Sequence, residues 1–234
     1  MTNVKNKRGG FYWVDGTPYA SVTDIISILD KGSQLMYWFG KQVFYATIKN
    51  PEISEVKALR APYDTLDKDA DRGSTVHSIV ESWKKTKEYI ETIPAPYRGY
   101  ADAFYAWLKD NKIEILENEK TVASKKNKFA GTVDIIGKVN GKLYVIDVKT
   151  NNSGAIYETY HLQVSAYIEA LRENGVAVEG GYVLVLSPEG KYTYGQVKEC
   201  FDVFLKLRDV WVWKNQEKCN KVGYSIQNKS KTEA

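Results

Sequence analysis

The stretch from Gly131 to Thr150, GTVDIIGKVNGKLYVIDVKT, is the most informative part of the chain. Asn140-Gly141 is the preferred dipeptide for a two-residue type I′ turn, and runs rich in Val and Ile flank it. The stretch therefore predicts a β-hairpin whose register can be counted outward from the turn. The sixth pair in that count places Asp134 opposite Asp147.

Two carboxylates that face each other across a hairpin need compensation. Cross-strand partners have Cβ atoms roughly 4.5–5.5 Å apart, and like charges at that distance are destabilising. A divalent cation held by the carboxylate oxygens is the simplest way to offset this repulsion. Lys149 leaves the strand on the same face as Asp147, because strand side chains alternate. Two acids and a base on one face can hold Mg²⁺, activate a water molecule and stabilise charge on a phosphate.

A simpler interpretation is that Asp147 and Lys149 are an ordinary exposed strand pair and that Lys149 neutralises Asp134. A single DxK pattern occurs often by chance. Here, however, the neighbouring residues Ile135 and Ile146 indicate strands that are buried on at least one face. Buried charges need partners, so the pattern favours a functional site over an exposed ion pair.

Further patterns accompany the hairpin in a defined order. GSTVHSIVE, residues 73–81, has Gly, His and Glu at intervals of four, and the acidic residue Glu119 lies between it and the hairpin. GTVD (131–134), DVK (147–149) and QVSAY (163–167) follow. In this order they resemble the GxxxHxxxE, GxxD, (D/E)xK and QxxxY motifs of the PD-(D/E)xK nuclease superfamily. The similarity is to the RecB-like branch, which includes phage-type and mitochondrial-type exonucleases.

The sequence departs from the family pattern at two points. Val133 stands where the proline of the family name would be, a replacement common in this branch. The four cysteines that hold an iron–sulfur cluster in some relatives are missing, since the chain has only Cys200 and Cys219. We therefore expect no iron–sulfur cluster.

The resemblance implies a fold and a set of roles. The fold is α/β, with a restriction-endonuclease-like mixed sheet flanked by helices. The implied cofactor is Mg²⁺ or Mn²⁺, as one or two ions, held by Asp134, Asp147 and the Val148 carbonyl with help from His77. Lys149 would position the attacking water and stabilise the transition state. The remaining implied site residues are Glu81, which would support the metal site from behind, Glu119, and Gln163 with Tyr167, which would orient the lysine or contact nucleic acid.

Each of these residues also has a structural interpretation. His77 and Glu81 share one helical face, but so does any surface His–Glu pair four residues apart. Glu119 is either a third acidic ligand or a charge at a strand edge. Gln163 and Tyr167 could belong to a helix surface that is partly tucked into the core.

Candidate nucleic-acid contacts lie between the nuclease motifs and before them. The formal net charge is +4, which is compatible with a local basic groove and argues against binding by bulk electrostatics alone. Four lysines before the hairpin could contact phosphates or could serve solubility: Lys120, Lys125, Lys126 and Lys128. Near the start of the chain, Tyr37 and Trp38 could stack on unpaired bases, although aromatic residues at helical spacing usually belong to a core.

The domain organisation follows from the same patterns. We expect a helical N-terminal accessory region at residues 1–70, a nuclease core at 71–219 and a polar, disordered tail at 220–234. At 43% apolar content the chain can bury a sizeable core. No apolar run approaches transmembrane length, and MTNVKNKRGG lacks the apolar segment of a secretory signal. These features predict a cytoplasmic protein without membrane contact, of a bacterial cell or a phage-infected host.

The predicted function is metal-dependent hydrolysis of DNA, by an exonuclease that acts on DNA ends, single-stranded ones included. A recombination or replication protein is a candidate partner. Two alternatives remain open: an endonuclease built on the same core, structure-specific or sequence-specific, and a non-catalytic module that binds DNA or a partner. The costly Asp134–Asp147 pair argues against the second, because a site without catalysis has little reason to retain it.

Overall fold

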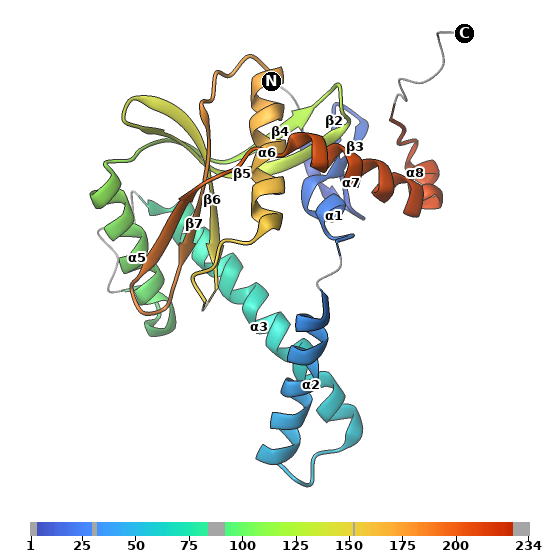
Figure 1. The fold of residues 1–234 in the computed structure, drawn as a ribbon, viewed down its shortest axis with the longest axis vertical. Helices are drawn as coiled ribbons and strands as arrows, with labels where there is room; N and C mark the ends of the chain where they lie inside the picture. The colour runs from blue at the N-terminus through green and yellow to red at the C-terminus, as the bar shows by residue number, and fades with distance from the viewer. Residues whose placement is uncertain (1–3, 30–31, 84–91, 152, 227–234) are drawn as a thin grey trace.

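One mixed β-sheet with helices on both faces organises the structure, a computed structural model that describes residues 4–29, 32–83, 92–151 and 153–226 (Figure 1). Its strands are β1 (Val4–Arg8), β2 (Phe11–Val14), β3 (Thr17–Ser21), β4 (Glu114–Ser124), β5 (Phe129–Val139), β6 (Lys142–Thr150), β7 (Gly180–Leu186) and β8 (Tyr192–Gln196). Its helices are α1 (Val22–Ile26), α2 (Gly32–Lys49), α3 (Glu55–Glu81), α5 (Ala95–Asn111), α6 (Glu158–Glu173), α7 (Phe201–Lys214) and α8 (Gln216–Val222).

Strand β5 lies at the centre of the sheet and pairs with three other strands. The antiparallel strand β4 follows one side of β5 along nearly its whole length. On the other side, β3 pairs with β5 in parallel at residues 129–130, and β6 pairs with it antiparallel at residues 135–139. Residues 131–134 of β5 therefore have no strand partner on that side among the described residues. This opening in the sheet, between β3 and β6, is where the predicted site residues converge.

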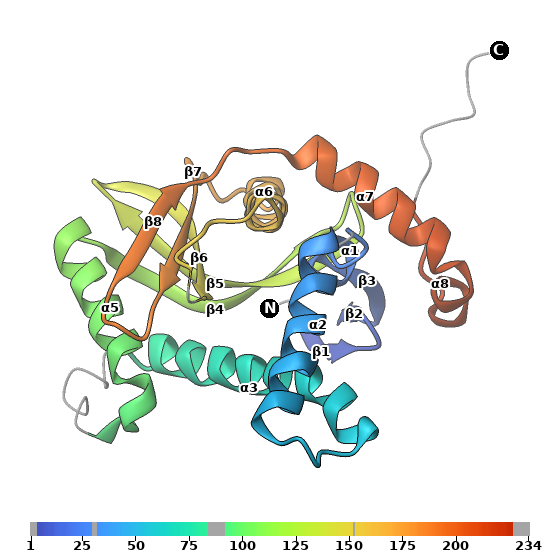
Figure 2. The same ribbon diagram turned by 60° about the horizontal axis from the view of Figure 1, so that its bottom comes forward.

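Helices cover the two faces of the sheet in separate layers (Figure 2). On one face, α1, α6 and α7 pack over Val133 and Val145. On the other, α3 and α5 pack over Ile135 and Ile146. Burial on both faces explains why β5 and β6 are almost continuously apolar. The arrangement confirms the predicted α/β fold with a mixed sheet flanked by helices.

The N-terminal region differs from the helical accessory region that the sequence predicts. The Phe11–Val14 strand does turn back as a hairpin, but β1, β2 and β3 extend the main sheet, because β3 pairs with β5. The predicted boundary at residue 70 falls inside α3, which is continuous from Glu55 to Glu81. Local sequence patterns do not reveal this pairing, since it joins segments about a hundred residues apart.

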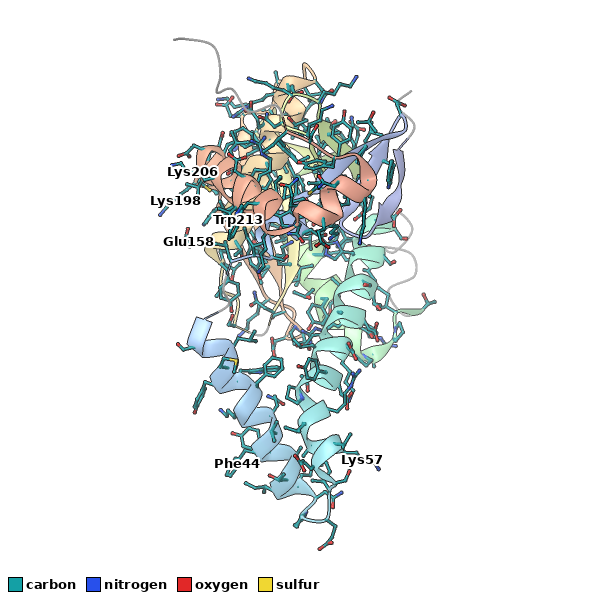
Figure 3. The ribbon with its side chains drawn as sticks, turned by 90° about the vertical axis from the view of Figure 1, so that its right-hand side faces the viewer. Phe44, Lys57, Glu158, Lys198, Lys206 and Trp213 are labelled. Carbon is teal, nitrogen blue, oxygen red and sulfur yellow. The ribbon has the colours of Figure 1, made fainter. Side chains whose placement is uncertain are left out.

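Helix α2 and the first half of α3 pack against each other and project from the rest of the molecule (Figures 1 and 3). The Phe39 and Tyr63 rings join the two helices edge to face, with centroids 5.3 Å apart. Figure 3 shows Phe44 and Lys57 near the end of this projection.

The predicted disordered tail is wrong for its first part. Helix α8 extends to Val222, and Tyr224 is buried, with its ring centroid 5.3 Å from that of Phe11. The segment after Asn220 is mostly polar, so its composition did not indicate that Tyr224 packs into the core. Residues 227–234 lie outside the described residues.

Candidate active site

The hairpin follows the predicted register up to the pair before the two acids. Paired positions run from Val139–Lys142 to Ile135–Ile146, and there the ladder ends. Instead of a sixth pair, the Val148 backbone N–H donates a hydrogen bond of 2.6 Å to Oδ2 of Asp134. The Asp134 carboxylate thus takes a donor that a continuing ladder would have used. The two strands separate at this point and leave the opening.

Tyr167 of α6 closes the opening from one side, and a glycine makes that contact possible. A Cβ atom at Gly131 would lie 2.4 Å from Cε1 of Tyr167, far inside van der Waals contact. Only a residue without a side chain lets the ring approach β5 so closely. The glycine of the GTVD pattern is therefore explained by packing of Tyr167.

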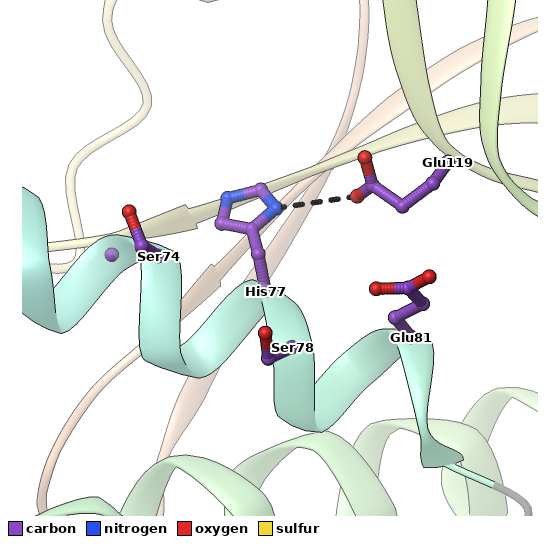
Figure 4. A pocket seen from close by; sticks show the side chains of 6 residues that line it. Ser74, His77, Ser78, Glu81 and Glu119 are labelled. Atoms are coloured by element: carbon purple, nitrogen blue, oxygen red, sulfur yellow. Dashed lines mark ion pairs between the residues drawn. The ribbon is translucent and has the colours of Figure 1, made fainter.

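Three residues from three elements form a compact group that could hold a cation. His77 of α3 places Nδ1 at 3.8 Å from Glu119 Oε1 (Figure 4). The same Nδ1 lies 3.5 Å from Asp134 Oδ1. The three residues offer ligand atoms that all lie within 4.8 Å of one another. Asp147 is not part of this group in the described structure.

The backbone at Glu119 is unusual for a strand. Its φ is +48°, although Asn118 and Lys120 on either side pair regularly with β5. A left-handed conformation is costly for a residue with a side chain, and such strain concentrates at functional sites. The pairing of the neighbouring residues places Glu119 across from Asp134. The residue with the left-handed backbone therefore lies beside the buried acid of the candidate cation site.

A cleft of about 480 Å³ opens along α3 beside this group. Gly73, His77 and Glu81, spaced by one helical turn, all line it, as does Glu119 on the facing strand (Figure 4). The lining also includes Ser74 and Ser78, which the sequence did not single out. Their place one residue after Gly73 and His77 was the available signal. The glycine–histidine–glutamate spacing thus marks the wall of a cleft.

Asp147 lies in a second group, formed with α6. Nζ of Lys149 donates to Asp147 Oδ1 at 3.1 Å and to Gln163 Oε1 at 3.2 Å. The Gln163 amide in turn donates to Asp147 Oδ1 at 2.9 Å and to the Tyr167 hydroxyl at 3.1 Å. Gln163 therefore connects the lysine, the acid and the tyrosine. That Gln163 orients Lys149 for catalysis stays a prediction.

Burial makes the acidic pair electrostatically expensive. Asp147 is 1% exposed and Asp134 is 8% exposed. Burial, and then the negative charge of Asp147, raise the pKa of Asp134 to about 7. The pKa of His77 is also raised: burial lowers it, but the carboxylates of Glu119 and Asp134 outweigh that effect. Likewise, burial opposes but does not cancel the rise that Asp147 and Asp134 cause in the pKa of Lys149.

These residues fit a divalent cation. The group supplies carboxylate oxygens, which Mg²⁺ and Mn²⁺ prefer, together with one imidazole. Among the described residues, the buried Oδ2 of Asp147 accepts no hydrogen bond of good geometry, although Lys149 Nζ lies 2.9 Å from it. A cation near Asp134 and Asp147 would offset both the repulsion between the acids and their desolvation.

Comparison with known proteins identifies the family. The family model described as the PD-(D/E)XK nuclease superfamily matches residues 53–209. The chain belongs to the PD-(D/E)xK nuclease superfamily. Membership makes it a nuclease, with nucleic acid as its substrate class, and nucleases of this superfamily use divalent metal ions. None of the curated proteins matches the chain.

Several solved structures resemble the nuclease at low identity. An alkaline exonuclease from Laribacter hongkongensis is 8% identical, with a TM-score of 0.45, over 88% of this chain and 91% of the other. A candidate exonuclease from Eubacterium rectale is 13% identical, with a TM-score of 0.45, over 87% and 80%. The protein SSO0001 is 14% identical, with a TM-score of 0.43, over 90% and 79%.

The sequence predicted that Asp134, Asp147 and Lys149 lie on one face of the sheet. The structure differs, because these residues are contacted from opposite faces. Asp134 is contacted from the α3 layer by His77, whereas Asp147 and Lys149 are contacted from the α6 layer by Gln163. The two groups meet through the opening between β3 and β6. The strand alternation was correct locally, but it could not show where the hairpin ladder ends.

Most of the predicted nucleic-acid contacts lie apart from this opening, but Lys120 pairs with Val133 of β5 beside it. Lys125, Lys126 and Lys128 are in or beside the β4–β5 turn, roughly 20 Å from Asp134 at the usual rise per strand residue. The Lys128 ammonium lies over the Tyr19 ring, and Lys120 pairs with Glu117 at 2.6 Å. On the projecting helix α2, Tyr37 is 74% exposed, while the half-buried Trp38 contacts the Phe39 ring.

Among the described helices, none combines the length and the apolar composition that a membrane span requires.

The raised pKa of Asp134 predicts how stability depends on pH without metal. The folded state holds this proton up to about pH 7, whereas the unfolded state releases it near 3.8. Unfolding therefore releases a proton between these values, and stability falls as pH rises through them, by up to about 1.4 kcal/mol per pH unit. The Asp134→Asn variant lacks this loss of stability with rising pH, because its amide does not ionise. In EDTA, we expect its gain in melting temperature over the wild type to grow from pH 5 to pH 7.

Thermal unfolding monitored by circular dichroism at several pH values checks this prediction. Asp202→Asn is a suitable control, because the Asp202 side chain is 76% exposed on α7. A gain for Asp134→Asn that does not change with pH would mean that Asp134 is ionised normally in the folded protein.

Proposed function

We propose that the protein is a Mg²⁺- or Mn²⁺-dependent deoxyribonuclease that degrades DNA from its ends. The observation that carries the proposal is the meeting of two groups in one opening of the sheet. A potential cation site of His77, Glu119 and Asp134 lies next to a buried acid–lysine pair, Asp147 and Lys149, and an open cleft adjoins them. The order of the nuclease motifs, which resembles that of phage-type and mitochondrial-type exonucleases, supports action on ends.

The residues of the site have separate roles in this proposal. Asp134, Asp147 and the Val148 carbonyl would hold the cation, with His77 and Glu119 completing its surroundings. When bound, the cation would stabilise negative charge on the phosphate and lower the pKa of a water molecule. Lys149 presents a permanent positive charge to the same phosphate and positions the attacking water. Gln163 fixes the lysine, and Tyr167 fixes Gln163.

Contacts with the rest of the DNA would come from outside the opening. We propose that the lysines of the β4–β5 turn and Lys120 contact phosphates, which would add affinity without base specificity. Tyr37 and Trp38 are proposed to stack on unpaired bases. Glu81, on the cleft wall beside His77, would support the cation site without touching DNA.

Linear and covalently closed DNA distinguish an exonuclease from an endonuclease. With Mn²⁺, the enzyme should reduce a labelled linear duplex, or its single-stranded form, to short products. The same DNA as a closed circle should survive at least about 10² times longer, because it offers no end. Gel electrophoresis of both substrates over time provides the measurement.

The outcomes separate the two modes of attack. Efficient nicking of the circle would overturn the exonuclease proposal and favour the endonuclease alternative. Binding of DNA without cleavage of either form would instead favour a non-catalytic module. Cleavage of RNA at the same rate would show that the substrate class is broader than DNA.

A further inference from the structure

The ammonium group of Lys149 has one neighbour that the nuclease motifs leave without a role. Two of its contacts are polar: Nζ donates to Asp147 Oδ1 and to Gln163 Oε1. The third is aromatic, since Nζ lies over the ring of Tyr160, 5.3 Å from its centroid. A cation within about 6 Å of an aromatic face is attracted by the ring quadrupole, most strongly where water is excluded.

Tyr160 is held in place by its surroundings. It lies in the first turn of α6, three residues before Gln163, so both side chains leave the helix on the same side. The ring of Tyr157 contacts it edge to face, with centroids 5.4 Å apart. Its hydroxyl hydrogen-bonds to the side chain of Asn151. The ring is therefore fixed on two sides and presents its face to Lys149.

The three contacts of Lys149 limit its movement in different directions. Asp147 and Gln163 accept hydrogen bonds, but an ammonium on a four-carbon chain can still rotate away from either of them. A half-buried ring over the ammonium restricts that rotation and covers the group from water. We propose that Tyr160 is a positioning residue, whose ring holds the Lys149 ammonium in the geometry that DNA hydrolysis requires. The inference rests on the proposed function, because it presumes that Lys149 acts in hydrolysis.

Three substitutions separate the ring from the rest of the side chain. Tyr160→Phe keeps the ring and loses only the hydroxyl, so its kcat should stay within about threefold of the wild type. Tyr160→Leu keeps apolar packing and loses the π face, and it should lower kcat about tenfold with little change in KM. Tyr45→Leu is the matched control, because the exposed Tyr45 ring on α2 lies under the ammonium of Lys41 and not under that of Lys149.

A double-mutant cycle with Lys149→Ala tests whether Tyr160 acts through the lysine. In the Lys149→Ala background, Tyr160→Leu should have no further effect on the residual rate, since the cation is gone. A merely structural role would produce the same tenfold loss in both backgrounds, and that result would overturn the proposal. Equal losses in Tyr160→Phe and Tyr160→Leu would overturn it as well, because the hydroxyl would then be the group that matters.

A second measurement does not depend on DNA cleavage. In EDTA, a water-soluble amine-acylating reagent is added to each full-length variant, and mass spectrometry follows modification of the peptide that contains Lys149. Loss of the covering ring should raise the acylation rate of Lys149 at least about threefold in Tyr160→Leu, but not in Tyr160→Phe or Tyr45→Leu. An unchanged rate in Tyr160→Leu would overturn the positioning role. If the rate rises and the wild type cleaves no DNA, the proposed function fails while the contact stands.

Discussion

Asp147→Ala and Lys149→Ala should each lower DNA cleavage by about 10²–10³. Removal of one preorganised group that stabilises transition-state charge typically has an effect of this size. Asp147 is buried and contacts both Lys149 and Gln163, so its loss also releases the lysine from its position. Steady-state rates on labelled linear DNA with Mn²⁺ provide the measurement.

The controls come from an exposed ion pair on α7. Nζ of Lys206 lies 3.8 Å from Oδ2 of Asp202, and the side chains of Asp202 and Lys206 are 76% and 78% exposed. Lys206 is labelled in Figure 3. Asp202→Ala and Lys206→Ala should keep the wild-type rate. Far-UV circular dichroism should be the same for all four variants. Wild-type cleavage by a folded Asp147→Ala or Lys149→Ala protein would rule out the assigned centre.

Turn chemistry is the reason that so much of the site could be predicted from the sequence. Asn140-Gly141 fixes the hairpin register, and the structure keeps that register through Ile135 and Ile146. Alternation of strand side chains then placed Asp147 and Lys149 together, and helical periodicity placed Gly73, His77 and Glu81 along one wall. All of these are local rules that act over a few residues.

The opening of the sheet could not be predicted in the same way. It exists because β3, from the start of the chain, pairs with β5 at residues 129–130, while the pairing of β6 with β5 stops at residue 135. Both facts depend on tertiary packing. The left-handed backbone of Glu119 is likewise invisible in the sequence, since glutamate has no preference for that conformation.

Two features were present in the sequence but carried no recognised signal. Tyr160 stands three residues before Gln163, on the same side of α6, and a tyrosine in the first turn of a helix is an ordinary feature without the position of Lys149. Tyr224, in a polar segment, anchors the end of the described chain against Phe11 and Trp211. In both cases the partner lies on a different helix or strand.

Removal of divalent metal should abolish cleavage, with a loss of at least about 10². Without a cation, the site lacks the charge that would stabilise the phosphate, and His77 and Lys149 are already engaged with carboxylates. Protein that has been stripped with EDTA and dialysed should regain its activity when Mn²⁺ or Mg²⁺ is added. Activity that persists in excess EDTA would mean that the group of His77, Glu119 and Asp134 has another purpose.

Calorimetric titration of Mn²⁺ alone into the wild type and into Asp134→Asn tests the central claim most directly. The amide oxygen of the substituted side chain can still accept the hydrogen bond from the Val148 N–H, so the variant removes mainly the charge. The measurement needs no DNA and is independent of cleavage. We expect the wild type to bind Mn²⁺ and the variant to bind it at least about tenfold more weakly. Equal binding by the two proteins would contradict the account, because Asp134 would then not be a ligand.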